Sequence, residues 1–303
     1  MSETKLKHSM GWLPDYPDFR DHTMESDEVP SRLKILGQKD SVKTMLKKTS
    51  VAKTAKAPPG RMDLRQWFSP VEHQGELGSC TANAGVGLVE YFEKRAHGKY
   101  IDASRLFLYK TSRNMAHSKG DTGAFLRTTM SAMVLFGVPP EDYWPYSVAD
   151  FDREPTAFCY AFAQNYQAMD YYRLDPPGTP RAALLGKIKA NLASGLPAMF
   201  GFTVFSSCDQ ADTTGRIPYP TIGEKNLGGH AVVAAGYDNQ MKIKNTVSGA
   251  KETTGALLIR NSWGKDWGED GYGWLPYDYV LKGLAIDWWS LLKNEWVDTW
   301  NFK

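Results

Sequence analysis

The sequence predicts an α+β protein whose first half is helical and whose second half forms an antiparallel sheet or barrel. In the first half, apolar residues recur at helical spacing near 80–95, 104–116 and 125–137. In the second half, short β-rich runs alternate with turns rich in Gly and Asn. A further helix at about 180–194, ending at Gly195, separates the two halves.

The limits of these elements follow from residues that start or stop them. Gly137 and the following Pro139–Pro140 pair are expected to end the helix near 125–137. Residues 281–303 carry Leu and Trp at mixed helical spacing, which predicts a C-terminal helix packed on the surface. The predicted strands are the runs PAMFGFTVF, HAVVAAGY, GALLIRNSW and GYGWLPY.

The first sixty residues differ in composition from the rest of the chain. Residues 1–30 are mainly acidic, whereas 31–61 hold nine Lys or Arg against one acid, Asp40. The run GWLPDYPDFRDH is typical of an extended arm lying on another surface, and one short helix is expected around Val42–Leu46. A solvated linker, an inhibitory pro-segment and an arm that reaches a charged partner all remain open. From Met62 onward the composition is that of a folded domain.

Overall composition limits the class of protein. A chain of 303 residues with 42% hydrophobic residues is globular and fills one large domain or two lobes. The net charge of +2 is too small to indicate a nucleic-acid partner. Without a CxxC pair or a His cluster, neither a metal nor another cofactor is expected, and pairing of Cys159 with Cys208 stays open.

The N-terminus MSETKLKHSMGW has no apolar core of a signal peptide, and no window is long and apolar enough to span a membrane. These features predict a protein that is cytoplasmic, or exported without a classical signal peptide.

Three residues are candidates for nucleophilic catalysis. Cys80 opens a predicted helix, where free N–H groups and the helix dipole would lower the pKa of a thiol. His230 begins an apolar strand and is a candidate base, and Asn261 could orient its ring. Taken singly, each also fits a structural role: a small buried thiol, a polar strand-edge residue and a strand-end turn residue.

Together, the segments around these residues resemble the papain family of cysteine peptidases. They are QGELGSC from Gln74 to Cys80, GGHAVVAAGYD around His230, and NSWGKDWG from Asn261 to Gly268. Their order matches that of the family, and the resemblance covers roughly residues 62–280. It is closest to a bacterial or archaeal branch of the family.

The resemblance implies a papain-like fold of two lobes with a cleft between them. The expected divisions are an arm, linker or pro-segment at 1–61, a helical lobe at about 62–178, a β-barrel-like lobe at about 179–280 and a C-terminal helix at 281–303, the last three forming one peptidase domain at 62–303.

The resemblance also implies a role for each site residue. Cys80 would attack the scissile carbonyl as a thiolate paired with protonated His230, which Asn261 orients. The Gln74 amide and the Cys80 N–H would form the oxyanion hole. The family's substrate-binding and covering positions fall here on Gly123, Gly229 and Trp263.

Four positions depart from the family pattern. Leu77 stands where the family has a disulfide cysteine, and Thr81 replaces an aromatic residue after the nucleophile. Thr122 replaces the first of two substrate-binding glycines, and Gly229 precedes His230 where Asp or Asn is frequent.

The predicted function is a monomeric cysteine peptidase that cleaves peptide or protein substrates through a thioester and is made latent by its N-terminal segment. Two alternatives remain open: a catalytically silent peptide-binding module, and an acyltransferase or amidase with the same triad.

Overall fold

The computed structural model describes residues 7–35, 37–48 and 58–293. Its helices are α1 (Ser31–Ile35), α2 (Val42–Lys48), α3 (Cys80–His97), α4 (Arg105–Met115), α5 (Leu126–Leu135), α6 (Ala157–Ala163), α7 (Arg181–Ala193) and α8 (Tyr277–Leu281). Its strands are β1 (Trp12–Leu13), β2 (Arg61–Asp63), β3 (Ala124–Phe125), β4 (Ala168–Arg173), β5 (Ala198–Phe205), β6 (Asn226–Lys244), β7 (Glu252–Arg260), β8 (Tyr272–Pro276) and β9 (Ala285–Lys293).

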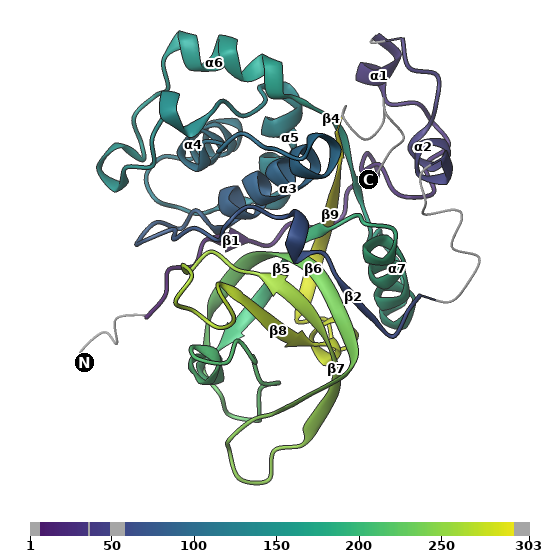
Figure 1. Cartoon of the computed structure of the whole chain (residues 1–303), viewed down its shortest axis with the longest axis vertical. Helices are drawn as coiled ribbons and strands as arrows, with labels where there is room; N and C mark the ends of the chain where they lie inside the picture. The colour runs from purple at the N-terminus through teal and green to yellow at the C-terminus, as the bar shows by residue number, and fades with distance from the viewer. Residues whose placement is uncertain (1–6, 36, 49–57, 294–303) are drawn as a thin grey trace.

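The elements form two lobes, as the α+β prediction requires (Figure 1). Helices α3, α4, α5 and α6 make the helical lobe, and the large sheet makes the other. Helix α3 lies where the lobes meet and packs against β6 as well as against α4 and α5. Its residues from Cys80 to Glu93 are buried, so the helix is covered on all sides.

The large sheet is antiparallel and open. Its strand order is β4-β9-β5-β6-β7-β8, and β2 pairs with the far part of β6. The order runs from an edge at β4 to an edge at β8, so the strands form an open, curved sheet instead of a closed barrel. Helix α7 packs against β6 and α8, and covers one side of this lobe.

The predicted helices near 80–95, 104–116, 125–137 and 180–194 are confirmed as α3, α4, α5 and α7. Ser104 accepts a hydrogen bond from the N–H of Phe107 and so caps the start of α4. Helix α3 ends at Gly98, whose φ of 73° is the left-handed conformation that glycine adopts without strain.

The predicted helix at 281–303 is wrong for the residues that the structure describes there. Residues 285–293 form strand β9, which lies between β4 and β5 and pairs with both. Trp288, Trp289, Leu291 and Leu292 are buried, so apolar residues on both faces of a central strand hide its period-two pattern. Residues 294–303 lie outside the described part of the chain. Strand β4 was also not predicted.

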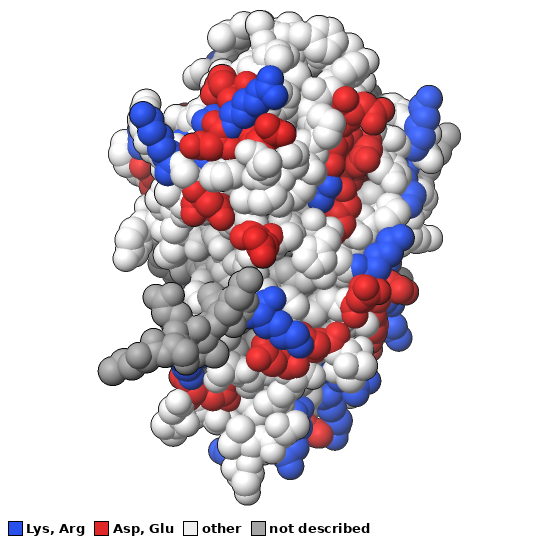
Figure 2. Space-filling view, turned by 90° about the vertical axis from the view of Figure 1, so that its left-hand side faces the viewer, with Lys and Arg blue, Asp and Glu red and all other residues white. Residues whose placement is uncertain are grey.

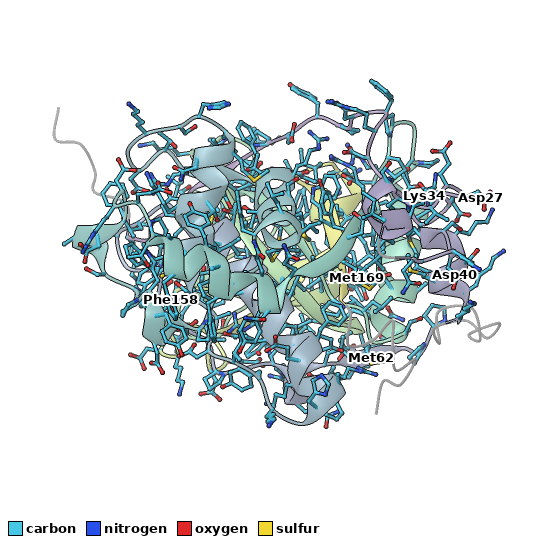
Figure 3. The ribbon with its side chains drawn as sticks, turned by 90° about the horizontal axis from the view of Figure 1, so that it is seen from above. Asp27, Lys34, Asp40, Met62, Phe158 and Met169 are labelled. Atoms are coloured by element: carbon cyan, nitrogen blue, oxygen red, sulfur yellow. The ribbon has the colours of Figure 1, made fainter. Side chains whose placement is uncertain are left out.

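The N-terminal residues contact both lobes. Strand β1 pairs in parallel with β3 of the helical lobe. Farther along, Leu33 of α1 and Val42, Met45 and Leu46 around α2 are buried in the main core. Asp27, Lys34 and Asp40 lie at one edge of the molecule, opposite Phe158 (Figure 3). Helices α1 and α2 are therefore packed as part of the body, although the boundary expected near residue 62 stays a prediction.

Charges of both signs are distributed over the surface. Figure 2 shows acidic groups beside basic ones on one face of the molecule. Within the described ranges, no helix has the length and apolar character needed to cross a bilayer.

Candidate active site

Cys80 lies at the start of α3, at the junction of the two lobes. Its side chain is fully buried, and its sulfur accepts a hydrogen bond from the Ala231 N–H of β6 at 3.4 Å. Because Ala231 follows His230 directly, this contact holds the thiol of one lobe beside the imidazole-bearing segment of the other.

The ring of His230 is oriented by Asn261. His230 Nε2 and Asn261 Oδ1 are 2.7 Å apart, and the same oxygen accepts a bond from the Ser262 N–H at 2.8 Å. A backbone N–H can only donate, so the atom that it contacts is the amide oxygen. His230 Nε2 must then carry the hydrogen, which leaves the lone pair on Nδ1. Nδ1 is buried, and no described residue hydrogen-bonds to it.

Gln74 is held rigidly between the two lobes. Its Oε1 accepts from Ser262 Oγ at 2.6 Å, and its backbone N–H donates to the Ser262 carbonyl at 2.9 Å. One hydrogen of Nε2 goes to the Leu77 carbonyl at 2.8 Å, and the other to the Ser9 carbonyl at 3.2 Å. The second contact places a carbonyl oxygen of the N-terminal segment at the donor expected to bind an oxyanion.

Trp263 covers His230, the position expected from the resemblance. The two ring centroids are 4.5 Å apart, and the planes are 24° from parallel. His8 stacks on the same indole at 4.2 Å and 7°. Trp263 is buried, so water has little access to His230 from this side.

Residues 9–12, which we name the cleft segment, lie over these groups. The Gly11 carbonyl accepts from the Ala124 N–H at 2.8 Å, and Trp12 pairs with Ala124 in the β1–β3 register. A Cβ atom added at Gly123 would lie 2.2 Å from the Gly11 oxygen, so this close approach requires glycine there. A cleft of about 1210 Å³ remains open alongside the segment and reaches Trp263.

Burial controls the ionisation of the central pair. Loss of solvent raises the pKa of Cys80 to about 11, although hydrogen bonds from the Ala231 and Gly11 N–H groups oppose this shift. Loss of solvent also lowers the pKa of His230 to about 4, against the effect of Asn261. The expected lowering of the Cys80 pKa is therefore wrong for this state, in which burial raises the pKa of Cys80 and lowers that of His230.

Gly229 lies against the indole of Trp12, which no sequence argument had placed there. A Cβ atom at Gly229 would be 2.7 Å from the ring, and Trp12 Nε1 donates to Asp287 Oδ2 at 3.1 Å. Ser262 and Asp287 were both missed as residues of this region. The sequence gives little indication of either residue. Ser262 lies inside the NSWG motif, where Asn261 drew the functional assignment, and Asp287 lies in a segment predicted as a helix.

The other two cysteines do not form a disulfide. Cys159 and Cys208 are both buried free thiols, so the pairing left open above does not occur.

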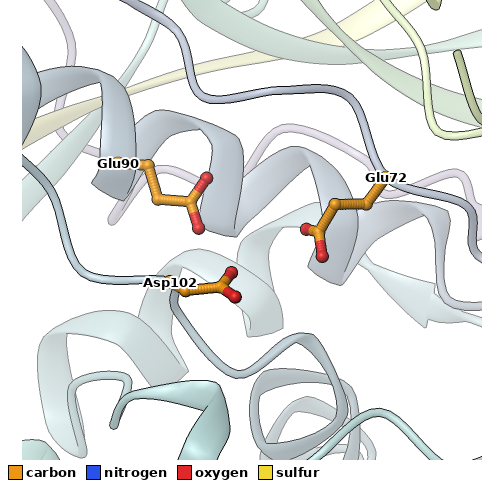
Figure 4. A group of neighbouring side chains, drawn as sticks. All are labelled: Glu72, Glu90 and Asp102. Carbon is orange, nitrogen blue, oxygen red and sulfur yellow. The ribbon is translucent and has the colours of Figure 1, made fainter.

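One group of carboxylates could hold a metal ion. Oxygens of Glu72, Glu90 and Asp102 lie within 4.8 Å of one another (Figure 4). Glu72 already pairs with Arg105 at 2.8 Å, and Glu90 accepts bonds from the Ala103 N–H and from Ser69 Oγ. Protein groups thus satisfy Glu72 and Glu90 without an ion.

The fold and this geometry define a class of protein: a two-lobe α+β chain with a thiol, an oriented imidazole and an amide at the junction. The model of the papain family cysteine proteases matches residues 58–285. The chain therefore belongs to the papain family and is a cysteine peptidase, a hydrolase.

Known relatives agree with this assignment. The chain is 33% identical to an uncharacterized peptidase C1-like protein of Acanthamoeba polyphaga mimivirus, over 96% of this chain and 89% of that protein. Cathepsin K of Gallus gallus is 29% identical, over 71% of this chain and 58% of that protein.

Among solved structures, Xylellain, a cysteine protease from Xylella fastidiosa, is 31% identical with a TM-score of 0.70. The match covers 95% of this chain and 97% of Xylellain. The digestive procathepsin L 3 of Tenebrio molitor shares the fold at 20% identity and a TM-score of 0.59, over 79% of this chain and 71% of that one.

Proposed function

We propose that this chain hydrolyses peptide bonds through Cys80, His230 and Asn261, and that the cleft segment keeps it latent. The observation that carries the catalytic part is the orientation of His230. With Nε2 bound to Asn261, the lone pair of Nδ1 is the one available to take a proton.

In the proposed reaction, His230 Nδ1 takes the proton of the Cys80 thiol, and the sulfur attacks the scissile carbonyl carbon. The protonated imidazole then gives its proton to the leaving amine, which leaves a thioester on Cys80. His230 next removes a proton from water, and the water oxygen attacks the thioester carbonyl carbon. The C–S bond then breaks, the carboxylic acid product leaves, and His230 returns the proton to the Cys80 sulfur.

The oxyanion of each tetrahedral intermediate would be bound by two donors. One is the backbone N–H of Cys80 at the start of α3, where the helix dipole also favours negative charge. The other is the Gln74 Nε2 hydrogen that now points to Ser9. The contacts with Ser262 and Leu77 support this role, because they hold the amide in place without using that hydrogen.

The proposed latency rests on the position of the cleft segment. Its Ser9 carbonyl occupies the Gln74 donor, its Gly11 backbone counteracts the rise in the Cys80 pKa, and its Trp12 is buried. A substrate carbonyl cannot reach Gln74 or Cys80 while these contacts persist. Release of the segment would also return solvent to the pair, so that the pKa of Cys80 falls and that of His230 rises.

A truncation tests both parts. Because α1 and α2 contribute to the core, only residues 1–13 should be removed. Hydrolysis of a short fluorogenic peptide is then compared with that of the full chain. The truncated chain should be more active, and Cys80→Ala within it should abolish hydrolysis. A folded but inactive truncated chain would contradict the peptidase mechanism, whereas equal activity of the two chains would contradict latency alone.

A further inference from the structure

Asp121 joins two loops that border the proposed active site. Its carboxylate accepts the Gly78 N–H, at 3.0 Å to Oδ1 and 3.1 Å to Oδ2, and it also accepts the hydroxyl hydrogen of Tyr109. Gly78 comes two residues before Cys80, and Asp121 comes two residues before Gly123, the expected substrate-binding glycine. All three cysteines of the chain are free, so no disulfide supports this contact between the loops.

The bond to Gly78 acts on the same peptide unit that holds Gln74. The unit between Leu77 and Gly78 is planar, so its C=O and its N–H point in opposite directions. The C=O accepts from Gln74 Nε2 at 2.8 Å, and the N–H donates to Asp121. Asp121 therefore fixes one end of a rigid unit whose other end fixes the Gln74 amide. Two hydrogen bonds on one peptide unit also polarise it, so each bond strengthens the other.

Tyr109, the second partner of Asp121, extends this contact to Gly123. Tyr109 lies on α4 and is fully buried, and its Oη accepts the Gly123 N–H at 3.1 Å. Burial and the Asp121 carboxylate raise the pKa of Tyr109, so its hydroxyl stays protonated and donates to Asp121. Arg113 lies over the Tyr109 ring at 4.3 Å and donates to the Gly120 carbonyl at 2.6 Å. Buried groups of α4 thus set the position of Asp121, although Asp121 itself is exposed.

We propose that Asp121 is a positioning residue for the oxyanion hole, and that it holds the Gln74 amide in place through the peptide unit between Leu77 and Gly78. The proposal rests on the proposed function, because it treats Gln74 Nε2 as a donor to the oxyanion. Without the carboxylate the peptide unit is free to rotate, and the Gln74 amide loses its fixed direction. Displacement of such a donor should lower the rate about ten- to hundredfold.

The first experiment follows Gln74 without any catalysis. In the full chain, NMR measures solvent exchange of the Gly78 amide hydrogen and of the Gln74 Nε2 hydrogens. Asp121→Ala removes the acceptor and should make both exchange about tenfold faster. Asp121→Asn keeps a side-chain oxygen that accepts the Gly78 N–H, so it should restore most of the protection. Unchanged exchange at Gln74 in Asp121→Ala would overturn the proposal.

Glu154→Ala is the matched control. Glu154 is another exposed carboxylate of the helical lobe, and it also accepts a tyrosine hydroxyl, from Tyr160 at 2.6 Å. Within the described part of the chain, none of its hydrogen bonds or ion pairs reaches residues 74–80. This variant should leave exchange at Gln74 at the wild-type rate. Equal acceleration by Glu154→Ala and Asp121→Ala would indicate general loosening of the lobe and would overturn a specific role of Asp121.

Two reaction rates of the full chain then separate positioning from general damage. Hydrolysis of a short peptide places negative charge on the carbonyl oxygen, whereas alkylation of Cys80 by iodoacetamide needs no oxyanion hole. The cleft segment obstructs both reactions, so the ratio of the two rates is compared between variants. Asp121→Ala should lower this ratio about ten- to hundredfold, and Asp121→Asn should recover most of it. An unchanged ratio, whether neither rate changes or both fall together, would overturn the positioning role.

Failure of the proposed function gives a different pattern. If hydrolysis depends on Cys80 in neither the full chain nor the chain lacking residues 1–13, the proposed function fails. The exchange measurement then still decides whether Asp121 positions the Gln74 amide. If hydrolysis depends on Cys80 but Asp121→Ala changes neither the exchange nor the ratio, the positioning role alone is overturned.

Discussion

Ser262 determines the chemistry available to two neighbouring side chains. Its N–H donates to the amide oxygen of Asn261, so this oxygen faces His230 and Nε2 of the ring carries the hydrogen. Its hydroxyl donates to Gln74 Oε1. One residue thus orients both the proposed base and the proposed oxyanion donor. Both contacts come from the turn that follows β7, so the site depends on how this turn is placed against the helical lobe.

Gln74 gives the most direct prediction at the level of single residues. In the chain lacking residues 1–13, Gln74→Ala should lower kcat by about 100- to 1000-fold with little change in KM, because the donor acts on the transition state. Gln210→Ala removes a side-chain amide that bonds to Asn245 and Thr246 and not to a proposed catalytic residue, and should leave kcat unchanged. A Gln74→Ala enzyme with wild-type kcat would remove Gln74 from the oxyanion hole.

Glu90 gives a prediction about stability. Burial raises its pKa from 4.5 in an exposed chain to about 7, so the folded state binds more protons than the unfolded state over this range. Stability therefore falls as pH rises from about 5 to about 7. In Glu90→Gln the fall should be smaller by up to about 1.4 kcal/mol per pH unit.

Urea unfolding at several pH values measures this difference. The exposed Glu25→Gln serves as the control and should keep the wild-type slope. A Glu90→Gln chain with an unchanged slope would show that Glu90 does not titrate in this range.

The identities of Cys80, His230, Asn261 and Gln74 could be proposed from sequence because they lie within contiguous motifs. The direction of the Cys80 pKa shift could not. It depends on the cleft segment, about seventy residues earlier in the chain, which removes solvent from a thiol that the helix dipole would otherwise favour as a thiolate.

At the level of elements, the N-terminal region has two distinct roles. Strand β1 pairs with β3 beside the site, whereas α1 packs against the edge strand β4 and the buried residues of α2 join the main core. The loop between them exposes Tyr16 (88%) and Phe19 (95%) to solvent, and is tied to the body where Asp21 pairs with Arg127. The proposed blocking of the site and the packing of the core are therefore assigned to different segments.

Met45 of α2 tests this separation. Met45→Ala should lower the free energy of unfolding by about 2–5 kcal/mol, because a fully buried side chain leaves a cavity. At temperatures where the fold is intact, it should not increase hydrolysis. Lys34→Ala, at an exposed position of α1, should change stability by less than about 0.5 kcal/mol. A Met45→Ala chain of wild-type stability would show that α2 is a dispensable arm.

Helices were easier to predict than strands, for a physical reason. Helix α5 has one buried face, and helix α4, although buried on all sides, has Ser104 as a clear cap at its start, so local sequence is sufficient. Strand β9 is buried on both faces, and only its pairing with β4 and β5 distinguishes it from an apolar helix. Such pairing joins segments that are far apart in sequence.

At the level of the whole molecule, the site exists only where the lobes meet. Cys80 comes from the helical lobe, His230 and Asn261 come from the sheet, and the cleft segment contacts both. The cleft segment thus forms part of the junction together with the two lobes. In the proposed latent state, access to Cys80 depends on the position of β1.

The most direct measurement is the rate at which an epoxide inhibitor of papain-type enzymes adds to Cys80, followed by intact mass. The chain lacking residues 1–13 should acquire one adduct rapidly, and the full chain far more slowly. Cys80→Ala and His230→Ala in the truncated chain should abolish it. Equal rates in the two chains, an adduct that does not require His230, or labelling of Cys159 or Cys208 instead would contradict a Cys80–His230 pair blocked by residues 9–12.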